Sequence, residues 1–125
     1  MLKPIHTTDA PAAIGPYAQA IVFGNLLFLS GQLPSDPQTG QIVSDDIALQ
    51  TEQCLNNAKA IIAQAGSSMD KVIKTTVFLK DLNFFGVVNE VYGRFFSEHK
   101  PARACVEVAR LPKDAKVEIE MVVGL

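Results

Sequence analysis

The stretch KPARACVEVARLPKDAKVEIEMVV, residues 100–123, decides the fold because it contains two segments in which apolar residues alternate with other residues. A period of two is typical of a β-strand that buries one face. The apolar members of the second segment are Val117, Ile119, Met121 and Val123. Glu118 and Glu120 lie between them, and burying a carboxylate is costly unless it is paired. The charged side of these strands therefore needs a partner that covers or pairs its side chains, or it must face solvent.

The first segment, RACVEVA (103–109), alternates in the same way. One side of this strand carries Arg103, Cys105 and Glu107. The other side carries Ala104, Val106 and Val108. We expect the apolar side of both strands to face the helices and the charged side to face away. The turn RLPKDA between the two strands predicts that they form a C-terminal hairpin.

Earlier in the chain, AIVFGNLLFLSG (20–31) is two apolar runs separated by Gly24-Asn25, which is typical of a two-residue hairpin turn. A proline-containing loop follows. Acidic residues at 45 and 46 then favour the start of a helix. Apolar residues recur at spacings of three and four over 47–65, and Gly66 ends this predicted helix.

The segment VIKTTVFLK (72–80) predicts a strand, and residues 83–98 predict a second helix that ends before Pro101. The buried side of this helix is expected to carry Phe84, Val88, Val91, Tyr92 and Phe95. The order of hairpin, helix, strand, helix and hairpin predicts an α+β fold, with two helices on one face of a mixed sheet. By its size the chain is expected to form a single domain over residues 1–125.

The sheet face opposite the helices is also expected to be apolar. LLFL (26–29) is apolar on both sides of the strand, and Ile73 is expected beside Val77 and Leu79, with Phe78 opposite. Because two helices cover only one face, the second face needs a partner, and we expect a second copy of the chain. The alternative is a sheet that curls enough to bury both faces.

Composition excludes several classes of function. The 125 residues are 48% hydrophobic with a net charge of −2, which gives no broad basic face for nucleic acid. No apolar run approaches the length of a membrane span. The N-terminal MLKPIHTTDAPAA lacks the apolar core of a signal peptide. We therefore expect a cytoplasmic protein that contacts no membrane.

The sequence contains no motif for a metal or a cofactor. Cys54 and Cys105 are too few for a disulfide framework and are expected to be free thiols, with Cys54 in the core. His6 and His99 are far apart, and no close cysteine pair accompanies them. A Gly-rich phosphate loop is also missing. We expect a protein that uses neither a metal nor a cofactor.

Several motifs together resemble the RidA (YjgF) family of reactive intermediate deaminases. They occur in the family's order across nearly the whole chain. The C-terminal motifs are Pro101-Ala102-Arg103, Val106, ARLP (109–112) and Val117-Glu118-Ile119. The others are APAAIGPYAQA (10–20), LFLSGQLP (27–34), VIKTTVFLKDL (72–82) and VNEVY (88–92).

The resemblance implies a chorismate-mutase-like fold that assembles as a homotrimer, with sites in the clefts between subunits. Members of the family hydrolyse 2-iminobutanoate and 2-iminopropanoate to 2-oxo acids and ammonia, without a metal or an organic cofactor. Their substrates arise from enamines that pyridoxal-phosphate-dependent threonine and serine dehydratases release. The chain is accordingly expected to be an enzyme that deaminates small 2-imino acids.

The resemblance assigns catalytic roles to two residues. Arg103 matches the family's substrate-binding arginine, and a guanidinium can hold a small carboxylate through two charge-assisted hydrogen bonds. Glu118 matches the glutamate that orients or activates the attacking water. Glu120, two residues away on the same side, is the alternative for that role. The residue pattern alone also allows an ion-pair network across an interface, or a solvated strand face.

Five further residues are expected to line the substrate site. Tyr17 resembles a tyrosine at the site mouth, or it anchors its own loop. Ser30 and Gly31 match residues that offer backbone groups to the ligand, or they simply end a strand. Asn89 matches the family's site asparagine as a buried amide, or it braces the helix on the sheet. Cys105 is expected to line the site through its main chain and not to act as a nucleophile.

One departure from the family and two other functions stay open. Many relatives carry an aromatic residue just before Pro-Ala-Arg, where this chain has Lys100, so the preferred substrate side chain is undetermined. A small module that binds 2-oxo acids, or a chaperone-like module, would lack turnover, and removal of the Glu118 carboxylate distinguishes it from an enzyme. Relatives have also been described as ribonucleases or translation inhibitors, which the net charge of −2 does not support.

Overall fold

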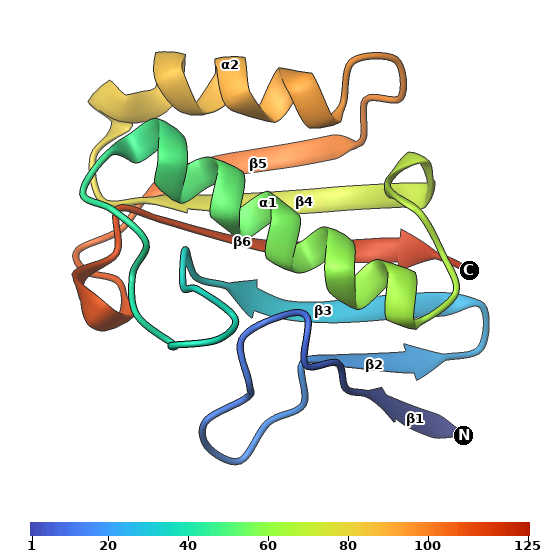
Figure 1. The fold of residues 1–125 in the computed structure, drawn as a ribbon. Helices are drawn as coiled ribbons and strands as arrows, with labels where there is room; N and C mark the ends of the chain where they lie inside the picture. The colour runs from blue at the N-terminus through green and yellow to red at the C-terminus, as the bar shows by residue number, and fades with distance from the viewer.

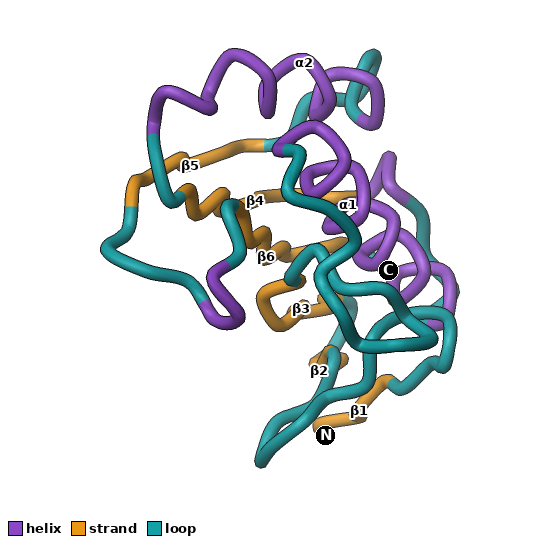
Figure 2. The backbone as a smooth tube through the Cα atoms, turned by 60° about the vertical axis from the view of Figure 1, so that its left-hand side comes forward, coloured by secondary structure: helices purple, strands orange, loops and turns teal.

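The computed structural model describes residues 1–125 and consists of a six-stranded sheet and two α-helices. The elements are β1 (Leu2–Ile5), β2 (Ala20–Phe23), β3 (Leu26–Gln32), α1 (Ile47–Gln64), β4 (Val72–Leu79), α2 (Phe85–Phe95), β5 (Ala102–Glu107) and β6 (Val117–Gly124). Short 3₁₀ turns lie at Met69–Lys71, Leu82–Phe84 and Pro112–Asp114. Helix α1 crosses in front of the sheet and α2 runs alongside β5 (Figure 1), and both lie on the same side of the strands (Figure 2). The predicted α+β class is confirmed.

The strands lie in the order β1-β2-β3-β6-β4-β5, and only β4 and β5 run parallel. The predicted C-terminal hairpin is wrong, because β4 lies between β5 and β6. The chain crosses over after β5 so that β6 pairs with both β3 and β4, and no local sequence signal specifies such a distant pairing. Strand β1, which contains Pro4, is absent from the sequence-based prediction because an edge strand of four residues shows no alternation.

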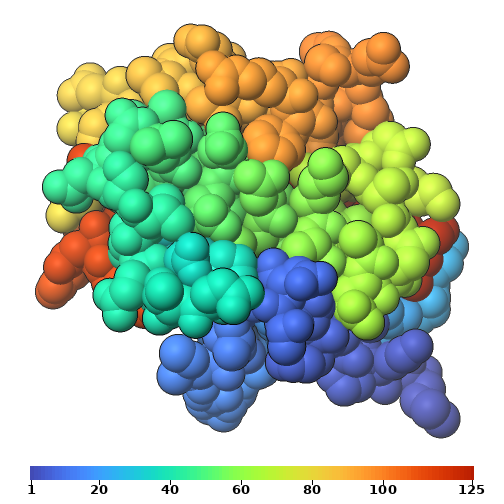
Figure 3. Space-filling model, in the orientation of Figure 1, coloured from blue at the N-terminus to red at the C-terminus, as the bar shows by residue number.

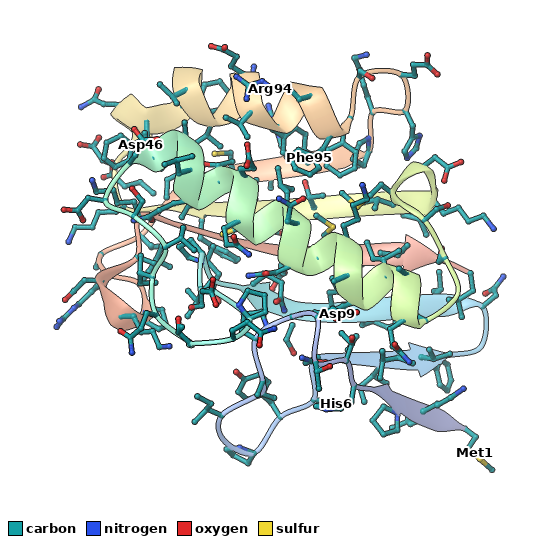
Figure 4. All side chains as sticks on the ribbon, viewed as in Figure 1. Met1, His6, Asp9, Asp46, Arg94 and Phe95 are labelled. Atoms are coloured by element: carbon teal, nitrogen blue, oxygen red, sulfur yellow. The ribbon has the colours of Figure 1, made fainter.

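Helix α1 begins and ends as the sequence predicts. The side chain of Asp46, at the start of the helix in Figure 4, accepts a hydrogen bond from the Leu49 N–H at 2.9 Å. At the other end Gly66 has φ +83°, and the N–H of Ser67 bonds to the carbonyl of Ile62 at 3.1 Å, which completes a Schellman cap. Neither helix has the length and apolarity needed to cross a membrane.

The core lies between the helices and one face of the sheet and contains 21 buried residues. All four alternating residues of β6 belong to it, as does Cys54 of α1. In α2, Val88, Val91 and Tyr92 are buried. Phe95 of α2 and Phe84 of the preceding 3₁₀ turn are partly buried and pack against the core. The two helices cover the upper part of this face of the molecule, and the N-terminal segment projects below them (Figure 3). The predicted helix-facing side of β6 is confirmed.

The opposite, outer face of the sheet exposes large apolar side chains: Phe28 is 44% exposed, Ile73 48% and Val106 42%. The prediction that Ile73 lies on the same side as Val77 is wrong. The register of β4 against β6 shifts between Val72 and Lys74, and this shift places Ile73 on the outer face. Within one chain the sheet therefore does not curl to bury both faces. We define the outer apolar face by Phe28, Ile73 and Val106.

Candidate active site

The predicted site residues fall into two groups on opposite faces of the sheet. Tyr17, Ser30, Gly31 and Glu118 line a cavity of 580 Å³, which we name the Glu118 pocket. Asn89 and Arg103 line a separate cavity of 390 Å³ between α2 and β5, which we name the Arg103 pocket. Cys105 lies two residues after Arg103 on the same side of β5 and lines neither cavity. One chain does not bring Arg103 and Glu118 together.

The placement of Arg103 and Cys105 corrects the sequence-based prediction, which put both on the side facing away from the helices. In the parallel ladder Arg103 is opposite Thr75 and Cys105 is opposite Val77, and both β4 residues are buried under the helices. The alternation of apolar and polar residues in β5 does not indicate which side faces the helices, because β5 is an edge strand whose residues are mostly exposed on both sides. Pairing with β4 sets the orientation instead.

Two aromatic rings and one side-chain amide hold the Arg103 guanidinium in place. Its central carbon lies 4.8 Å from the ring centroid of Tyr92 and 5.4 Å from that of Phe85. One terminal nitrogen donates a hydrogen bond to Asn89 Oδ1 at 2.7 Å. The two ion pairs of the chain join Glu90 to Arg94 and Asp114 to Arg110, so Arg103 pairs with no carboxylate. A held cation with free N–H donors is a binding site for an anion.

Helix α2 supplies this support from a single face, because Phe85, Asn89 and Tyr92 are spaced by four and three residues. The Tyr92 hydroxyl shares a 2.7 Å hydrogen bond with the hydroxyl of Thr75, which is fully buried. Asn89 is exposed and not the buried amide that the sequence predicted. Sequence reasoning also missed Phe85, although its helical spacing from Asn89 would have indicated it.

The Glu118 pocket forms around an irregularity in β3. Between Leu29 and Gln32, two residues of β3 face a single residue of β6, which is a β-bulge. A Cβ atom built on Gly31 would lie 2.9 Å from the Glu118 carboxylate carbon, so any larger residue here would displace the Glu118 carboxylate from its present position. The Ser30 hydroxyl donates to the Ala18 carbonyl at 2.6 Å and therefore holds the preceding segment. Because of the bulge, the Glu118 carboxylate lies directly against the backbone of Gly31, which has no side chain.

Glu118 is half-buried, and this burial raises the pKa of its carboxyl group above the ordinary value. The negative charge of Glu120 raises the same pKa further. Glu120 itself is exposed and does not line the cavity. Of the two candidate acids, therefore, only Glu118 lines the pocket.

The outer wall of the Glu118 pocket is a loop that the buried Gln19 holds. Its side-chain amide donates to the carbonyls of Thr7 at 3.0 Å and Pro11 at 2.9 Å, and its side-chain oxygen accepts from the Thr7 N–H at 2.8 Å. Tyr17 lies on this loop with an exposed ring. Sequence reasoning missed Gln19, since a glutamine that organises a distant loop has no local pattern.

Lys113 closes the opposite side of the Glu118 pocket. It and Asp114 have φ angles of +59° and +54°, which are strained for residues other than glycine. The Lys113 ammonium donates to the Gly40 carbonyl, and Asp114 is held by Arg110 at 2.8 Å. These contacts stabilise the strained turn beside the carboxylate.

Cys105 has the properties of a packing residue. It is half-buried against the core, and this burial raises the pKa of its thiol, with a smaller opposing effect from the charge of Arg103. A thiol that keeps its proton is a poor nucleophile. No three His, Cys, Asp or Glu side chains cluster so that they could hold a metal ion.

The sequence and the fold place this chain in a known family. The family model described as Endoribonuclease L-PSP matches residues 7–124. The chain belongs to this family, the RidA (YjgF) family. The resemblance inferred from the motifs is thereby confirmed.

Relatives of the chain in the RidA family match it over almost its full length. A RutC family protein of Pyrococcus horikoshii is 57% identical over 122 residues, covering 98% of this chain and 97% of the relative. The 2-iminobutanoate/2-iminopropanoate deaminase of Escherichia coli K12 is 54% identical over 125 residues, with 98% and 97% covered.

Solved RidA-family structures share the fold described above. The YjgF gene product of E. coli has a TM-score of 0.93 and 53% identity, and covers 98% of each chain. E. coli TdcF with bound serine has a TM-score of 0.94 and 51% identity, and also covers 98% of each chain. The mixed sheet with two helices on one face is therefore a fold that these relatives share.

Proposed function

We propose that this chain hydrolyses small 2-imino acids, with 2-iminobutanoate and 2-iminopropanoate as substrates, to 2-oxo acids and ammonia. The observation that carries the proposal is the full-length similarity, at 54% identity, to the E. coli deaminase of that name. The two pockets supply the residue types that this reaction needs, an unpaired guanidinium and a carboxylate of raised pKa.

In this proposal Arg103 binds the substrate carboxylate. The aromatic rings of Phe85 and Tyr92 and the amide of Asn89 fix the guanidinium plane, so the substrate meets a pre-oriented fork. A lysine at this position would keep the charge but lose the planar grip. Tyr17 and the backbone of Ser30, Gly31 and Cys105 complete the proposed lining of the site.

Glu118 manages the water in the proposed reaction. Water adds to the carbon of the protonated imine as Glu118 accepts a proton from it, and the resulting carbinolamine has a C–O bond and an amino group. Return of the proton to nitrogen makes the amino group a leaving group. As the C–N bond breaks and the carbonyl forms, the departing ammonia takes the hydroxyl proton and leaves as ammonium. The sum is protonated imine plus water giving 2-oxo acid plus ammonium, the protonated form of ammonia, and Glu118 regains its ionised state.

We propose that the working site forms between subunits of a homotrimer. Two features support this arrangement. Arg103 and Glu118 lie on opposite faces of the sheet in one chain, and the outer apolar face of Phe28, Ile73 and Val106 is exposed. When the outer face packs against another copy, the Arg103 pocket of one subunit can meet the Glu118 pocket of its neighbour.

We also propose that the protein works in the cytoplasm, where dehydratases release the enamines from which such imines form. Both cysteines are free thiols, which fits a reducing compartment.

A coupled assay tests the proposed reaction. Threonine dehydratase generates 2-iminobutanoate while semicarbazide competes for it, and the wild-type chain should suppress semicarbazone formation. Arg103→Ala should not suppress it, although it should retain the fold and the oligomeric state. Equal trapping with wild type and with no protein would overturn the proposal.

A binding module without turnover is the second candidate, because the related E. coli TdcF has been solved with bound serine. The Glu118→Gln variant separates the two functions. An enzyme should lose turnover while keeping its affinity for 2-oxobutanoate. A binding module should show no turnover even before the substitution.

A further inference from the structure

We propose that the Arg103 pocket selects ligands with a second carboxylate, so that 2-imino acids with an acidic side chain are substrates of this chain. The inference rests on the proposed deaminase function and names a substrate class for it. It comes from the composition of the cavity beside Arg103, where Lys100 supplies a second cation.

The Arg103 pocket is lined by two cations and by no acidic side chain. The lining residues are Asn89, Tyr92, Gly93, Phe96, Lys100, Pro101 and Arg103. Neither Lys100 nor Arg103 forms an ion pair anywhere in the chain. Two uncompensated positive charges in one cavity favour a ligand with two negative charges.

Both cations retain donors for such a ligand. Lys100 uses one of its three N–H donors on the carbonyl of Ser97, at 2.6 Å, and this bond holds its flexible stem. Arg103 uses one nitrogen on Asn89 and has further N–H groups available. Arg103 can therefore hold the carboxylate next to the imine while Lys100 holds the carboxylate of the side chain.

The floor of the pocket strengthens these attractions. The rings of Tyr92 and Phe96 are nearly buried and pack against each other with their centroids 4.7 Å apart. An apolar floor excludes water from one side of the cavity, so charges above it are screened less than on an open surface. The Lys100 charge should consequently affect affinity more than an isolated surface lysine would.

Calorimetric titration with two 2-oxo acids tests this inference. The probes are 2-oxobutanoate, with one carboxylate, and 2-oxoglutarate, with two, at equal ionic strength. We expect wild type to bind 2-oxoglutarate more tightly. Lys100→Met should weaken the binding of 2-oxoglutarate by roughly fivefold to tenfold, the range of a partly desolvated ion pair. The Kd for 2-oxobutanoate should stay within about twofold of the wild-type value.

Two variants control the titration. Lys100→Arg retains the charge and should keep most of the preference for 2-oxoglutarate. Lys59→Met removes an exposed lysine of α1 that lies outside the Arg103 pocket, and it should change neither affinity. If Lys100→Met weakens the binding of both ligands equally, or the binding of neither, the inference is wrong.

A kinetic arm separates this inference from the proposed function. An amino-acid oxidase generates 2-iminoglutarate from glutamate, and threonine dehydratase generates 2-iminobutanoate, with semicarbazide present in both assays. Lys100→Met should lower kcat/KM for 2-iminoglutarate alone. Hydrolysis of 2-iminobutanoate without any Lys100-dependent preference would refute the inference and leave the deaminase function standing. Lys100-dependent binding of 2-oxoglutarate without hydrolysis of either imine would refute the deaminase function, and with it the claim that acidic 2-imino acids are substrates, and would leave only the ligand preference of the Arg103 pocket standing.

Discussion

The two pockets hold their charged residues in different ways. Arg103 is exposed and lies on side chains of one helix, with the rings of Phe85 and Tyr92 below it and Asn89 beside it. Glu118 is half-buried and lies against the bare backbone of Gly31, inside a bulge of the sheet. Side chains therefore orient the cation, whereas backbone geometry and burial determine the environment of the carboxylate.

This difference matches the two tasks in the proposed reaction. A binding arginine must keep its charge and its orientation, and aromatic rings and an amide supply orientation without neutralising it. A residue that transfers protons needs a pKa nearer to neutral, which partial burial provides. Because the two pockets lie on opposite faces, one chain alone does not bring Arg103 and Glu118 together.

The largest expected effect tests that separation. Arg103→Ala and Glu118→Gln should each lose at least about a hundredfold in kcat/KM, since each removes a charged group from the site. Mixing the two variants after partial denaturation and refolding should restore about a quarter of wild-type activity, because random exchange in a ring pairs an intact Arg103 with an intact Glu118 at that frequency. Imine trapping measures it.

A site made within one chain would give no recovery after mixing. Refolding each variant alone through the same procedure provides the control, and each should stay inactive. The proposed intersubunit site would be abandoned if the mixture behaved like the average of its parts.

The Glu118→Gln variant should also be more stable than wild type at pH 7. Folding raises the pKa of Glu118, so wild type at neutral pH must hold an ionised carboxylate where the folded state disfavours it. Glutamine removes that penalty. As the pH falls through the raised folded-state pKa toward the ordinary value, wild type regains stability and the difference closes. Thermal unfolding of both proteins between pH 4 and pH 8 measures this, using about the ordinary glutamate pKa as the lower limit.

A difference in Tm that persists unchanged at the acidic end would contradict this account of Glu118. Glu120→Gln is the matched control, because Glu120 is exposed and outside the pocket. Its substitution should lower the pKa of Glu118 slightly and leave kcat nearly unchanged.

A methyl group at Gly31 should have an intermediate effect. The Cβ of Gly31→Ala would approach the Glu118 carboxylate carbon at 2.9 Å, so the carboxylate must move. We expect kcat to fall by about tenfold, because small displacements of a catalytic group are costly. Gly86→Ala, in α2 with no neighbouring atom within 4 Å and without a positive φ, controls for the loss of a glycine and should leave kcat intact. An unchanged kcat for Gly31→Ala would show that Glu118 has no fixed position.

The smallest effect concerns the aromatic floor under Arg103. Tyr92→Leu should weaken binding of 2-oxobutanoate by about twofold to fivefold, the value of one exposed cation–π contact. Tyr92→Phe keeps the ring and should keep the affinity, but it leaves the buried Thr75 hydroxyl without its partner and so lowers the Tm. Equal affinities for Tyr92→Leu and wild type would show that Asn89 and Phe85 orient the guanidinium without the Tyr92 ring.

Much of the local structure could be predicted from the sequence because local signals specify it. Asp46 and Gly66 mark the two ends of α1, and the alternation from Val117 to Val123 identifies the buried side of β6. In β4, by contrast, the simple alternation failed at Ile73, since a register shift there depends on pairing with β6.

The sequence by itself determined the α+β class, the two ends of α1 and, through its motifs, membership of the RidA family. Only the tertiary structure decided that β4 separates β5 from β6 and that Arg103 lies on the helix side, opposite Glu118. The physical reason is that the orientation of an exposed edge strand depends on its pairing with a distant strand. Hydrophobic alternation within β5 carries no information about that partner.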